Sequence, residues 1–331
     1  MNGRDSIIVI SQIEKTADRR IKESEKKMSD VIVLEDVTKR YGNEEVVKNA
    51  SMHVKEGEIY GFLGPNGAGK TTVMKLILNL AKPDCGNIRV FGEPVLPDSY
   101  TYLRYVGNLI ETPCFYEKLS AGRNLRLHCE YMGIYEEGRI EQALEQVGLQ
   151  GCENKIVGKF SLGMKQRLGI ARALLAKPKL LLLDEPINGL DPVGIRQTRD
   201  LLVHLKEACG TTILISSHII SEIEQLADTV GVINKGRMLK EMPMEEIRRE
   251  AVQYLEVHVN DVRKAAIALE ERYGRLNYKI ISDSGLRIYQ DLPFDEISRL
   301  LVQAGVAILN MGSKNDTLED YFFGMLGEDG E

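Results

Sequence analysis

The pattern of hydrophobic and polar positions divides the chain into three parts. Residues 1–30 are rich in Lys, Arg, Glu and Ser and show helical spacing at best over 13–28, so we interpret them as a poorly packed or helical N-terminal extension. Short apolar runs then alternate with helical patterns over residues 31–245. A separate pattern of short strands and helices occupies residues 251–331. The pattern therefore predicts an extension followed by a larger and a smaller domain.

The segment 31–245 has the pattern of an α/β core. Continuous apolar or β-branched runs are typical of buried parallel strands. A longer stretch, residues 121–176, is mostly helical, which predicts a mixed sheet with an inserted helical subdomain at about 112–176. The strand candidates are Ile59–Leu63, Leu180–Leu183 and Thr212–Ser216, and the first helix candidate is Lys70–Leu80.

The C-terminal segment predicts a small α+β domain. Its order of elements is β-α-β-β-α-β followed by a last helix, which is the order of a split βαβ, ferredoxin-like unit. The turn-prone Asp283-Ser284-Gly285 separates the second and third strands. The strand candidates are Tyr254–Val259, Tyr278–Ser282, Leu286–Gln290 and Ala307–Met311, and the helix candidates are Val262–Tyr273, Phe294–Gln303 and Thr317–Leu326.

Composition narrows the class of protein. The chain of 331 residues has a net charge of -6, which gives no reason to expect a nucleic acid as partner. Its five cysteines are scattered without a CxxC pair, so neither a disulfide framework nor a zinc site is indicated. No apolar run approaches the roughly 18–20 residues that cross a bilayer. If the protein serves a membrane, we expect it to do so through a partner.

A phosphate-binding loop is the first motif that carries chemistry. The sequence matches G-x-x-x-x-G-K-[ST] directly after a strand candidate and at the start of a helix candidate. Glycines allow the backbone N–H groups to surround the phosphates, and the helix N-terminus adds positive partial charge. We expect Lys70 to reach the β- and γ-phosphates and Thr71 to ligate Mg²⁺. The predicted nucleotide-binding residues are Gly64, Pro65, Asn66, Gly67, Ala68, Gly69, Lys70, Thr71 and Thr72.

A pair of acids follows the apolar run Leu180–Leu183. Strand C-termini are where α/β sheets bind ligands, so Asp184 and Glu185 are placed for chemistry. Asp184 offers a hard oxygen ligand to a metal, and Glu185 is a candidate general base for the attacking water. An Asp-Glu pair alone is usually a solvated turn. Downstream of a phosphate loop it is far more specific.

Further motifs produce a resemblance to ABC transporter ATP-binding subunits. Residues 160–167, Phe-Ser-Leu-Gly-Met-Lys-Gln-Arg, are similar to the signature motif of that family, and Asn188-Gly189-Leu190-Asp191 resembles its D-loop. His218 resembles the switch histidine that contacts the γ-phosphate, and Tyr41 the aromatic residue that stacks on adenine. The motifs occur in the family's order over roughly residues 31–245.

The resemblance implies an ATPase that works as a dimer. Ser161 and Gly163 would face the γ-phosphate of ATP bound to a second subunit, and Asp191 would also take part in nucleotide binding. A homodimer or a pair with a paralogous subunit, separately encoded transmembrane permease subunits, ATP and Mg²⁺ are the implied partners and cofactors. Each residue also has a structural alternative: Tyr41 a surface aromatic, His218 a core histidine, and Ser161 an ordinary helix cap.

Two positions depart from the usual pattern of the family. The signature reads Ser-Leu-Gly-Met where Ser-Gly-Gly-Gln is usual, but Ser161 and Gly163 are retained. The segment Val106-Gly107-Asn108-Leu109-Ile110-Glu111 ends in glutamate where the family has a glutamine that touches the metal and attacking water. We expect Glu111 to add negative charge beside Asp184 and Glu185 as a third metal residue, the alternative being a solvated loop acid. These features resemble the bacitracin-resistance and lantibiotic-immunity branch.

The leading hypothesis is therefore the ATP-hydrolysing subunit of an ABC exporter for a membrane-active peptide antibiotic or a related amphiphile. Such a subunit would lie in the cytoplasm, on the inner face of the cell membrane through its permease. A soluble ABC-type ATPase that acts on ribosomes or nucleic acid is the alternative, although those proteins usually carry two cassettes or a long coiled coil. A P-loop kinase would leave the signature and His218 without a role.

Overall fold

The computed structural model describes residues 29–134, 136–250, 253–290, 292–315 and 318. The chain divides into two compact units, Met1–Glu241 and Met242–Glu331. The predicted extension 1–30 lies outside the described residues except for its last two positions, and so does nearly all of the predicted helix Thr317–Leu326. Within the described part of the chain, no helix is both long and apolar enough to cross a membrane.

A six-stranded sheet forms the centre of the first unit. Its strand order is β10-β9-β3-β8-β7-β6, and the pairs β9-β3, β3-β8, β8-β7 and β7-β6 are all parallel. The middle strands β3, β7 and β8 are buried along their whole length, which explains their unbroken apolar sequences. The strands are β3 Ile59–Leu63, β6 Val106–Leu109, β7 Leu180–Asp184, β8 Thr212–Ser217, β9 Thr229–Asn234 and β10 Arg237–Pro243.

A second, antiparallel sheet in this unit was not predicted from the sequence. Its order is β2-β1-β4-β5, and register shifts interrupt the pairing of β1 with β2. These irregularities blur the alternation of apolar and polar positions that marks a strand. The strands are β1 Asp30–Tyr41, β2 Glu44–Lys55, β4 Cys85–Val90 and β5 Glu93–Pro94. Together the two sheets give the mixed sheet core that the sequence predicts.

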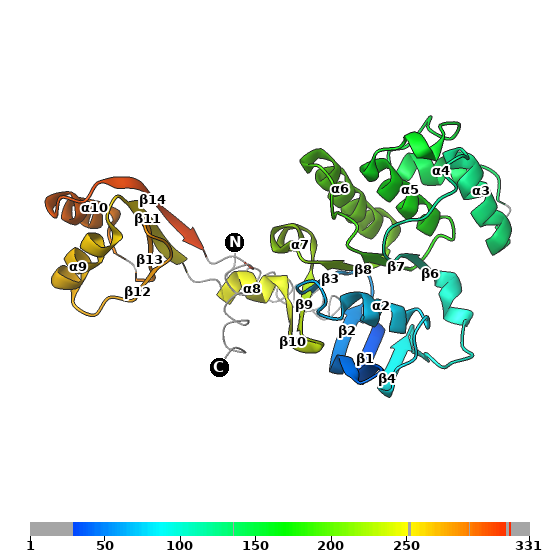
Figure 1. Ribbon diagram of the computed structural model, residues 1–331, viewed down its shortest axis with the longest axis horizontal. Helices are drawn as coiled ribbons and strands as arrows, with labels where there is room; N and C mark the ends of the chain where they lie inside the picture. Colours follow the sequence, from blue (N-terminus) through cyan, green and yellow to red (C-terminus); the bar gives the residue numbers. More distant parts are fainter. Residues whose placement is uncertain (1–28, 135, 251–252, 291, 316–317, 319–331) are drawn as a thin grey trace, which may run out of the picture. The chain divides into compact units, whose positions relative to one another are not determined.

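One hydrophobic core joins the two sheets through helix α2. Tyr60, Phe62, Leu182 and Leu214 of the parallel sheet pack in the same cluster as Val73 of α2 and side chains of β1 and β2. Figure 1 shows α2 and the antiparallel sheet below the parallel sheet, with helices α5, α6 and α7 on the other side. Helix α2 therefore packs between the two sheets, and this packing fixes the position of the loop that precedes the helix.

Helices α3, α4 and α5 form the inserted helical subdomain (Figure 1). Helix α5 packs against β6 so closely that a Cβ on Gly107 would lie 2.6 Å from the carbonyl oxygen of Ala173. The helices of the first unit are α2 Lys70–Ile77, α3 Ala121–Met132, α4 Arg139–Gln146, α5 Leu162–Leu174, α6 Pro192–Cys209 and α7 Ile220–Leu226, with 3-10 turns η1 at Thr101–Tyr105 and η2 at Val157–Lys159.

Helix α2 ends earlier than the predicted Leu80. It spans Lys70–Ile77, and Asn79 beyond it has a φ of 57°, in the left-handed region. The Asn79 side chain donates to the carbonyl oxygen of Leu96, 2.8 Å away. Asparagine tolerates this conformation better than most residues, so it ends the helix where the apolar periodicity alone would continue.

The second unit contains the predicted split βαβ topology. Its sheet has the order β12-β13-β11-β14 with antiparallel pairs throughout, which is the ferredoxin-like arrangement. Helices α9 and α10 pack on one side of it through Leu269, Ile297 and Leu301. The elements are α8 Met244–Glu250, β11 Gln253–Val259, α9 Val262–Tyr273, β12 Tyr278–Ile280, β13 Gly285–Ile288, α10 Phe294–Gln303 and β14 Ile308–Asn315.

Candidate nucleotide-hydrolysis site

The loop between β3 and α2 is buried at its two ends and exposed in its middle. Gly64, Ala68 and Gly69 are buried, whereas Pro65, Asn66 and Gly67 are exposed. A Cβ on Gly64 would lie 2.4 Å from the carbonyl oxygen of Ile233, so this position requires glycine. Gly69 precedes α2 with a φ of 109°, which only glycine adopts readily. The loop thus presents N–H groups at a helix N-terminus, the arrangement that binds phosphate.

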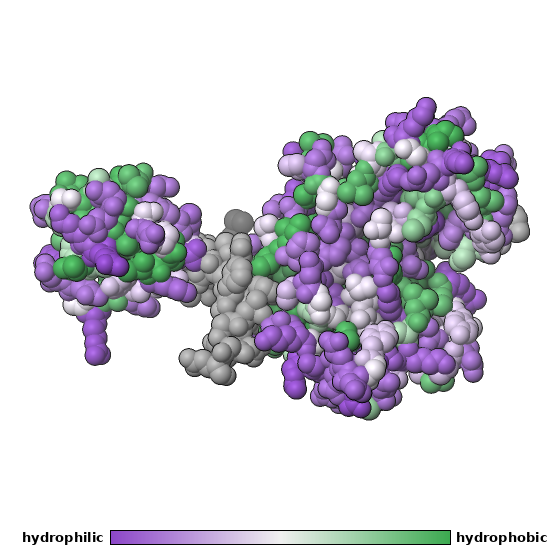
Figure 2. All heavy atoms as spheres, viewed as in Figure 1, coloured by the Kyte–Doolittle hydropathy of each residue, from purple (hydrophilic) through white to green (hydrophobic). Residues whose placement is uncertain are grey.

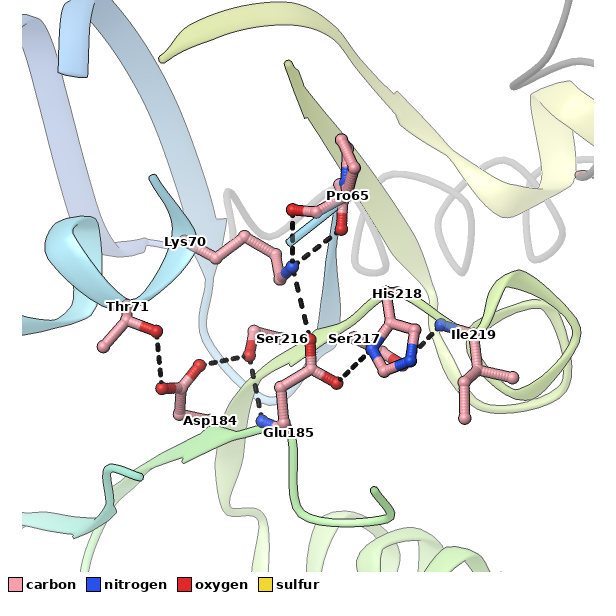
Figure 3. Close-up of polar contacts among 10 residues, drawn as sticks. Pro65, Lys70, Thr71, Asp184, Glu185, Ser216, Ser217, His218 and Ile219 are labelled. Carbon is pink, nitrogen blue, oxygen red and sulfur yellow. Dashed lines mark hydrogen bonds and ion pairs between the residues drawn. The ribbon is translucent and has the colours of Figure 1, made fainter. Parts of the chain in front are cut away.

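Lys70 turns back over this loop. Its side chain is only 6% exposed, and its Nζ donates to the carbonyl oxygens of Gly64 at 2.7 Å and Pro65 at 3.2 Å. The same Nζ lies 3.2 Å from Oε1 of Glu185 (Figure 3). A buried ammonium group needs such partners, because removing it from water without them costs several kcal/mol. Its charge is therefore held at the centre of the loop.

Asp184 is fixed by hydroxyl groups on two sides. Thr71 Oγ1 donates to Asp184 Oδ2 at 2.7 Å, and Ser216 Oγ donates to Oδ1 at 2.6 Å. Figure 3 shows the three side chains converging from α2, β7 and β8. Asp184 is the last residue of its strand and is only 5% exposed. Thr71 and Asp184, two of the three predicted metal ligands, therefore lie in contact.

Glu185 lies next in the chain and points toward two basic groups. Its backbone has a φ of 48°, a left-handed conformation that is uncommon for a non-glycine residue and clusters at functional sites. One carboxylate oxygen approaches Lys70, and the other lies 2.8 Å from Nδ1 of His218 (Figure 3). Lys70, Glu185 and His218, the predicted catalytic residues, thus form one connected cluster.

Glu111 contacts a different partner from the one expected. Its carboxylate accepts a hydrogen bond from Lys75 Nζ at 2.6 Å, and its side chain is 63% exposed. The hydrogen bond from Lys75 to Glu111 is the main reason that the pKa of Lys75 is raised above its usual value. Glu111 also has a φ of 62°. Its role as a metal ligand stays a prediction.

Two further predicted residues, Tyr41 and Thr72, are at least partly exposed. Tyr41, at the end of β1, is half exposed, and the ammonium group of Lys39 lies 5.3 Å from the centre of its ring. Thr72 follows Thr71 in the first turn of α2 and is partly buried. An exposed aromatic ring at the end of a strand suits stacking on a base, which stays a prediction for Tyr41.

Ser161 and Asp191 cap the two helices that begin at the signature and the D-loop. Ser161 Oγ accepts from the backbone N–H of Met164 at the start of α5, and Asp191 Oδ1 accepts from that of Gly194 at the start of α6. Both residues are exposed. Within the described residues, no hydrogen bond or ion pair joins either side chain to the loop 64–71. A single copy thus leaves these caps open to solvent.

The unusual Leu162 is accommodated by the D-loop. A Cβ on Gly189 would lie 3.0 Å from Cδ2 of Leu162, and one on Gly163 would lie 3.4 Å from Cδ2 of Leu190. Each leucine therefore lies over the glycine of the other segment. The signature and the D-loop pack against each other within one chain, which explains how leucine is tolerated where the family usually has glycine.

Comparison with known proteins assigns the family. The ABC transporter family model matches residues 47–188. The chain is 48% identical to the ABC transporter ATP-binding protein YcbN of Bacillus subtilis over 90% of this chain and 98% of that protein. The chain belongs to the ATP-binding subunits of ABC transporters. As a member of this family, it binds and hydrolyses ATP.

Two further relatives have named transport roles. The bacitracin transport ATP-binding protein BcrA of Bacillus licheniformis is 45% identical over 91% of this chain and 98% of that protein. The lantibiotic transport ATP-binding protein SrtF of Streptococcus pyogenes is 42% identical over 64% of this chain and 90% of that protein. These matches confirm the predicted branch of the ABC ATP-binding subunits.

Solved structures agree with the fold. An ATP-binding subunit of an ABC transporter matches with a TM-score of 0.59 and 32% identity, over 66% of this chain and 92% of that one. A dimeric ATP-binding cassette bound to ADP and Pi matches with a TM-score of 0.58 and 26% identity, over 64% of this chain and 98% of that one. The mixed sheet with its helical subdomain is thus that of an ABC ATPase.

Sequence reasoning missed Ser216 and Lys75 as members of this site. Ser216 is fully buried, and its hydroxyl both donates to Asp184 and accepts from the backbone N–H of Glu185 at 3.0 Å. It therefore orients both acids, as groups behind metal ligands commonly do. Its proximity in sequence to His218, at the same edge of the sheet, was the available signal. Lys75 gave no comparable signal.

We predict that Ser216→Ala lowers the rate of ATP hydrolysis by about 10- to 100-fold, because both acids lose the hydroxyl that orients them. Steady-state ATPase assays over a range of Mg²⁺ concentrations provide the measurement. Ser217→Ala is the matched control, since the Ser217 hydroxyl accepts from the backbone N–H of Ile219 and contacts neither acid. Equal rates of ATP hydrolysis by Ser216→Ala and the unmodified protein would show that Ser216 has no role in the site.

Proposed function

We propose that this chain is the ATP-hydrolysing subunit of an ABC exporter that removes a membrane-active peptide from the cell membrane. The observation that carries the proposal is the convergence of Lys70, Asp184, Glu185 and His218 on one phosphate loop. The choice of cargo rests on the bacitracin and lantibiotic transport relatives. The related proteins compared above are named as transport proteins, which gives the ribosome or nucleic-acid alternative no support.

The donor set in this site fits Mg²⁺. Thr71 and Asp184 offer hard oxygen atoms that already lie 2.7 Å apart, beside the loop that would hold the phosphates. A bound Mg²⁺ supplies charge neutralisation for the phosphate oxygens. The hydroxyl of Thr71 and the carboxylate of Asp184 would hold it, while Ser216 keeps the second carboxylate oxygen engaged.

Lys70, Glu185 and His218 would each have a separate role in hydrolysis. Lys70 would exchange its two carbonyl partners for the β- and γ-phosphates, which are stronger acceptors for an ammonium group. Glu185 would then lose Lys70 as its partner and be available to accept a proton from the attacking water. His218 would hold the other carboxylate oxygen and so keep the base in position.

The complete site requires a second copy of the chain or a paralogous subunit. Ser161 and Gly163 lie at the start of α5 and Asp191 at the start of α6, and their exposed caps leave them free to meet the nucleotide of a partner. The N-terminus of α5 carries positive partial charge that favours a γ-phosphate. We infer that two chains enclose two ATP molecules between the loop of one and the signature of the other.

A groove beside the helical subdomain is the proposed docking surface for a permease. It has a volume of about 380 Å³ and lies between the end of α2, strand β6 and helices α3 and α5. Leu80 is 69% exposed and Met132 51% exposed along it, while Arg172 adds positive charge. Figure 2 shows hydrophobic surface in this region. A cytoplasmic helix with an apolar face and an acidic residue would fit, and would hold the subunit at the inner membrane face.

Glu111 lies after β6, which lines that groove, and we propose that it links the permease to the metal. Its carboxylate is held by Lys75 in the structure described here. Docking or nucleotide binding would release it toward Asp184, where it would add a negative charge near Mg²⁺. In this proposal Lys75 acts as the resting partner of Glu111.

We predict that Glu185→Gln removes almost all ATP hydrolysis and traps an ATP-bound dimer, because a glutamine cannot accept the proton. ATPase assays and size-exclusion chromatography with ATP measure the two effects. When the natural gene in the cell is replaced by the Glu185→Gln variant, a lower concentration of bacitracin or a lantibiotic should be enough to inhibit growth. Lys70→Ala is the control, since it should remove nucleotide binding and leave a monomer. Fast turnover by Glu185→Gln would refute the role of Glu185.

We predict that Leu80→Lys weakens co-purification of the permease by roughly tenfold or more, since a charge would have to be buried in the groove. Basal ATP hydrolysis by the isolated subunit should stay unchanged. Pull-down from detergent-solubilised membranes, with ribosomes counted in the same fraction, provides the measurement. Ile267→Lys, which changes another exposed apolar residue, on α9, is the control. Recovery of ribosomes in place of a membrane protein would favour the soluble alternative.

We predict that Glu111→Gln raises the Mg²⁺ concentration needed for half-maximal ATP hydrolysis or weakens the coupling of hydrolysis to transport, because a negative charge near the metal is lost. Lys75→Gln is the matched variant: it breaks the same ion pair but retains the carboxylate, so it should not raise the Mg²⁺ requirement. If Glu111→Gln changes neither quantity, Glu111 is a solvated loop acid.

A further inference from the structure

The hairpin of β1 and β2 brings Tyr41 close to the phosphate loop. Tyr41 pairs with Glu44 across the turn of this hairpin. Two residues farther along β2, the backbone of Val46 approaches the loop so closely that a Cβ on Gly69 would lie 2.9 Å from the Val46 carbonyl oxygen. Tyr41 is 51% exposed. An accessible aromatic ring therefore lies near the loop that would hold the phosphates, and its value to a ligand depends on how firmly it is held.

Asp84 extends the pairing of β1 beyond the end of β4. The pairing of these two strands ends where Thr38 meets Cys85, the first residue of β4. The backbone N–H of Asp84 donates to the carbonyl oxygen of Thr38 at 2.8 Å, and Asp84 Oδ2 accepts from the backbone N–H of Arg40 at 2.6 Å. The hydrogen bond from Arg40 is the main reason that the pKa of Asp84 lies below its usual value. A carboxylate thus holds β1 directly before Tyr41.

Lys39 supports the ring of Tyr41 directly. The Lys39 side chain is only 14% exposed, its ammonium group lies 5.3 Å from the ring centre, and the same group forms an ion pair with Asp84 Oδ2 at 3.3 Å. A cation over one face of an aromatic ring is attracted to that face. The side chain of Arg40 has its own partner, since its Nε donates to Glu45 at 2.9 Å. One carboxylate oxygen of Asp84 therefore fixes both the strand that carries Tyr41 and the cation beside its ring.

We propose that Asp84 and Lys39 are positioning residues for the base of the bound nucleotide and act through Tyr41. This rests on the predicted stacking of the base on Tyr41 and adds the groups that order the ring. A ring that is already ordered loses less side-chain entropy when a ligand stacks on it, so binding is stronger. The support acts on the base and not on the phosphates, because Lys70 and the loop 64–71 would bind those. It does not depend on the cargo or the permease.

Binding of ADP and of inorganic pyrophosphate to the full chain separates the base from the phosphates. Both ligands carry two linked phosphates, and only ADP has a base and a ribose. ADP is a product of ATP hydrolysis, so turnover does not disturb the measurement. Isothermal titration calorimetry with Mg²⁺ present would give the dissociation constant of each ligand for each variant.

We expect Tyr41→Ala to weaken ADP binding by roughly tenfold or more, which is the usual effect of losing an aromatic stacking partner. Asp84→Ala and Lys39→Met should each weaken it by about two- to fivefold, the effect of a cation–π contact at an exposed site, and should leave pyrophosphate binding unchanged. Added to Tyr41→Ala, neither should weaken ADP binding further, because the ring on which they act is gone. Glu35→Ala is the matched control: it breaks the ion pair with Arg89 between the same two strands and should change neither ligand.

Two results would overturn the proposal and leave the stacking prediction in place. One is that Asp84→Ala and Lys39→Met both bind ADP as tightly as the unmodified protein. The other is that they lose pyrophosphate binding by the same factor as ADP binding, which would make their role structural. Pyrophosphate binding also shows that a variant is folded, and Lys39→Met provides an independent reading if Asp84→Ala is not.

The stacking prediction has its own outcome in the same experiment. If Tyr41→Ala binds ADP as tightly as the unmodified protein, the base does not stack on Tyr41, and the proposal for Asp84 and Lys39 fails with it. The predictions for the ATPase are unaffected by either failure, since each is measured at Glu185, Ser216, Leu80 or Glu111.

Discussion

The parallel pairing of β3, β8 and β7 is the constraint on which the site depends. Leu63 pairs with Ser217, and Asp184 pairs with Ser216, so the ends of three strands lie at one edge of the sheet. The chain leaves β3 into the phosphate loop, β7 into Glu185, and β8 into His218. Parallel strands with short turns after them concentrate side chains at this edge. A change in register would separate the acids from the loop.

This arrangement places a buried cation beside two acids, and their balance governs the site. Lys70 donates to two carbonyl oxygens and forms an ion pair with Glu185, while Asp184 accepts hydrogen bonds from two hydroxyl groups. In the proposed mechanism, phosphate oxygens would replace the carbonyl partners of Lys70, and a metal would bind beside Thr71 and Asp184. The protein is therefore organised so that ligand binding exchanges contacts, which costs less than creating a new buried charge.

Two other groups of the ATPase unit contrast with that balance. The caps at Ser161 and Asp191 face solvent, and in the proposed function they would complete the nucleotide site of a second chain.

The sequence by itself determined the local parts of this protein. The glycine spacing of residues 64–71, the acids after Leu183 and the order of the C-terminal elements follow from short-range patterns, because loop conformation and strand burial depend on neighbouring residues. Only the tertiary structure decided which hydroxyls meet Asp184 and that Glu111 pairs with Lys75. Thr71 and Asp184 lie 113 positions apart. Contacts over such separations depend on how the strands pair, and no local pattern of residues records that.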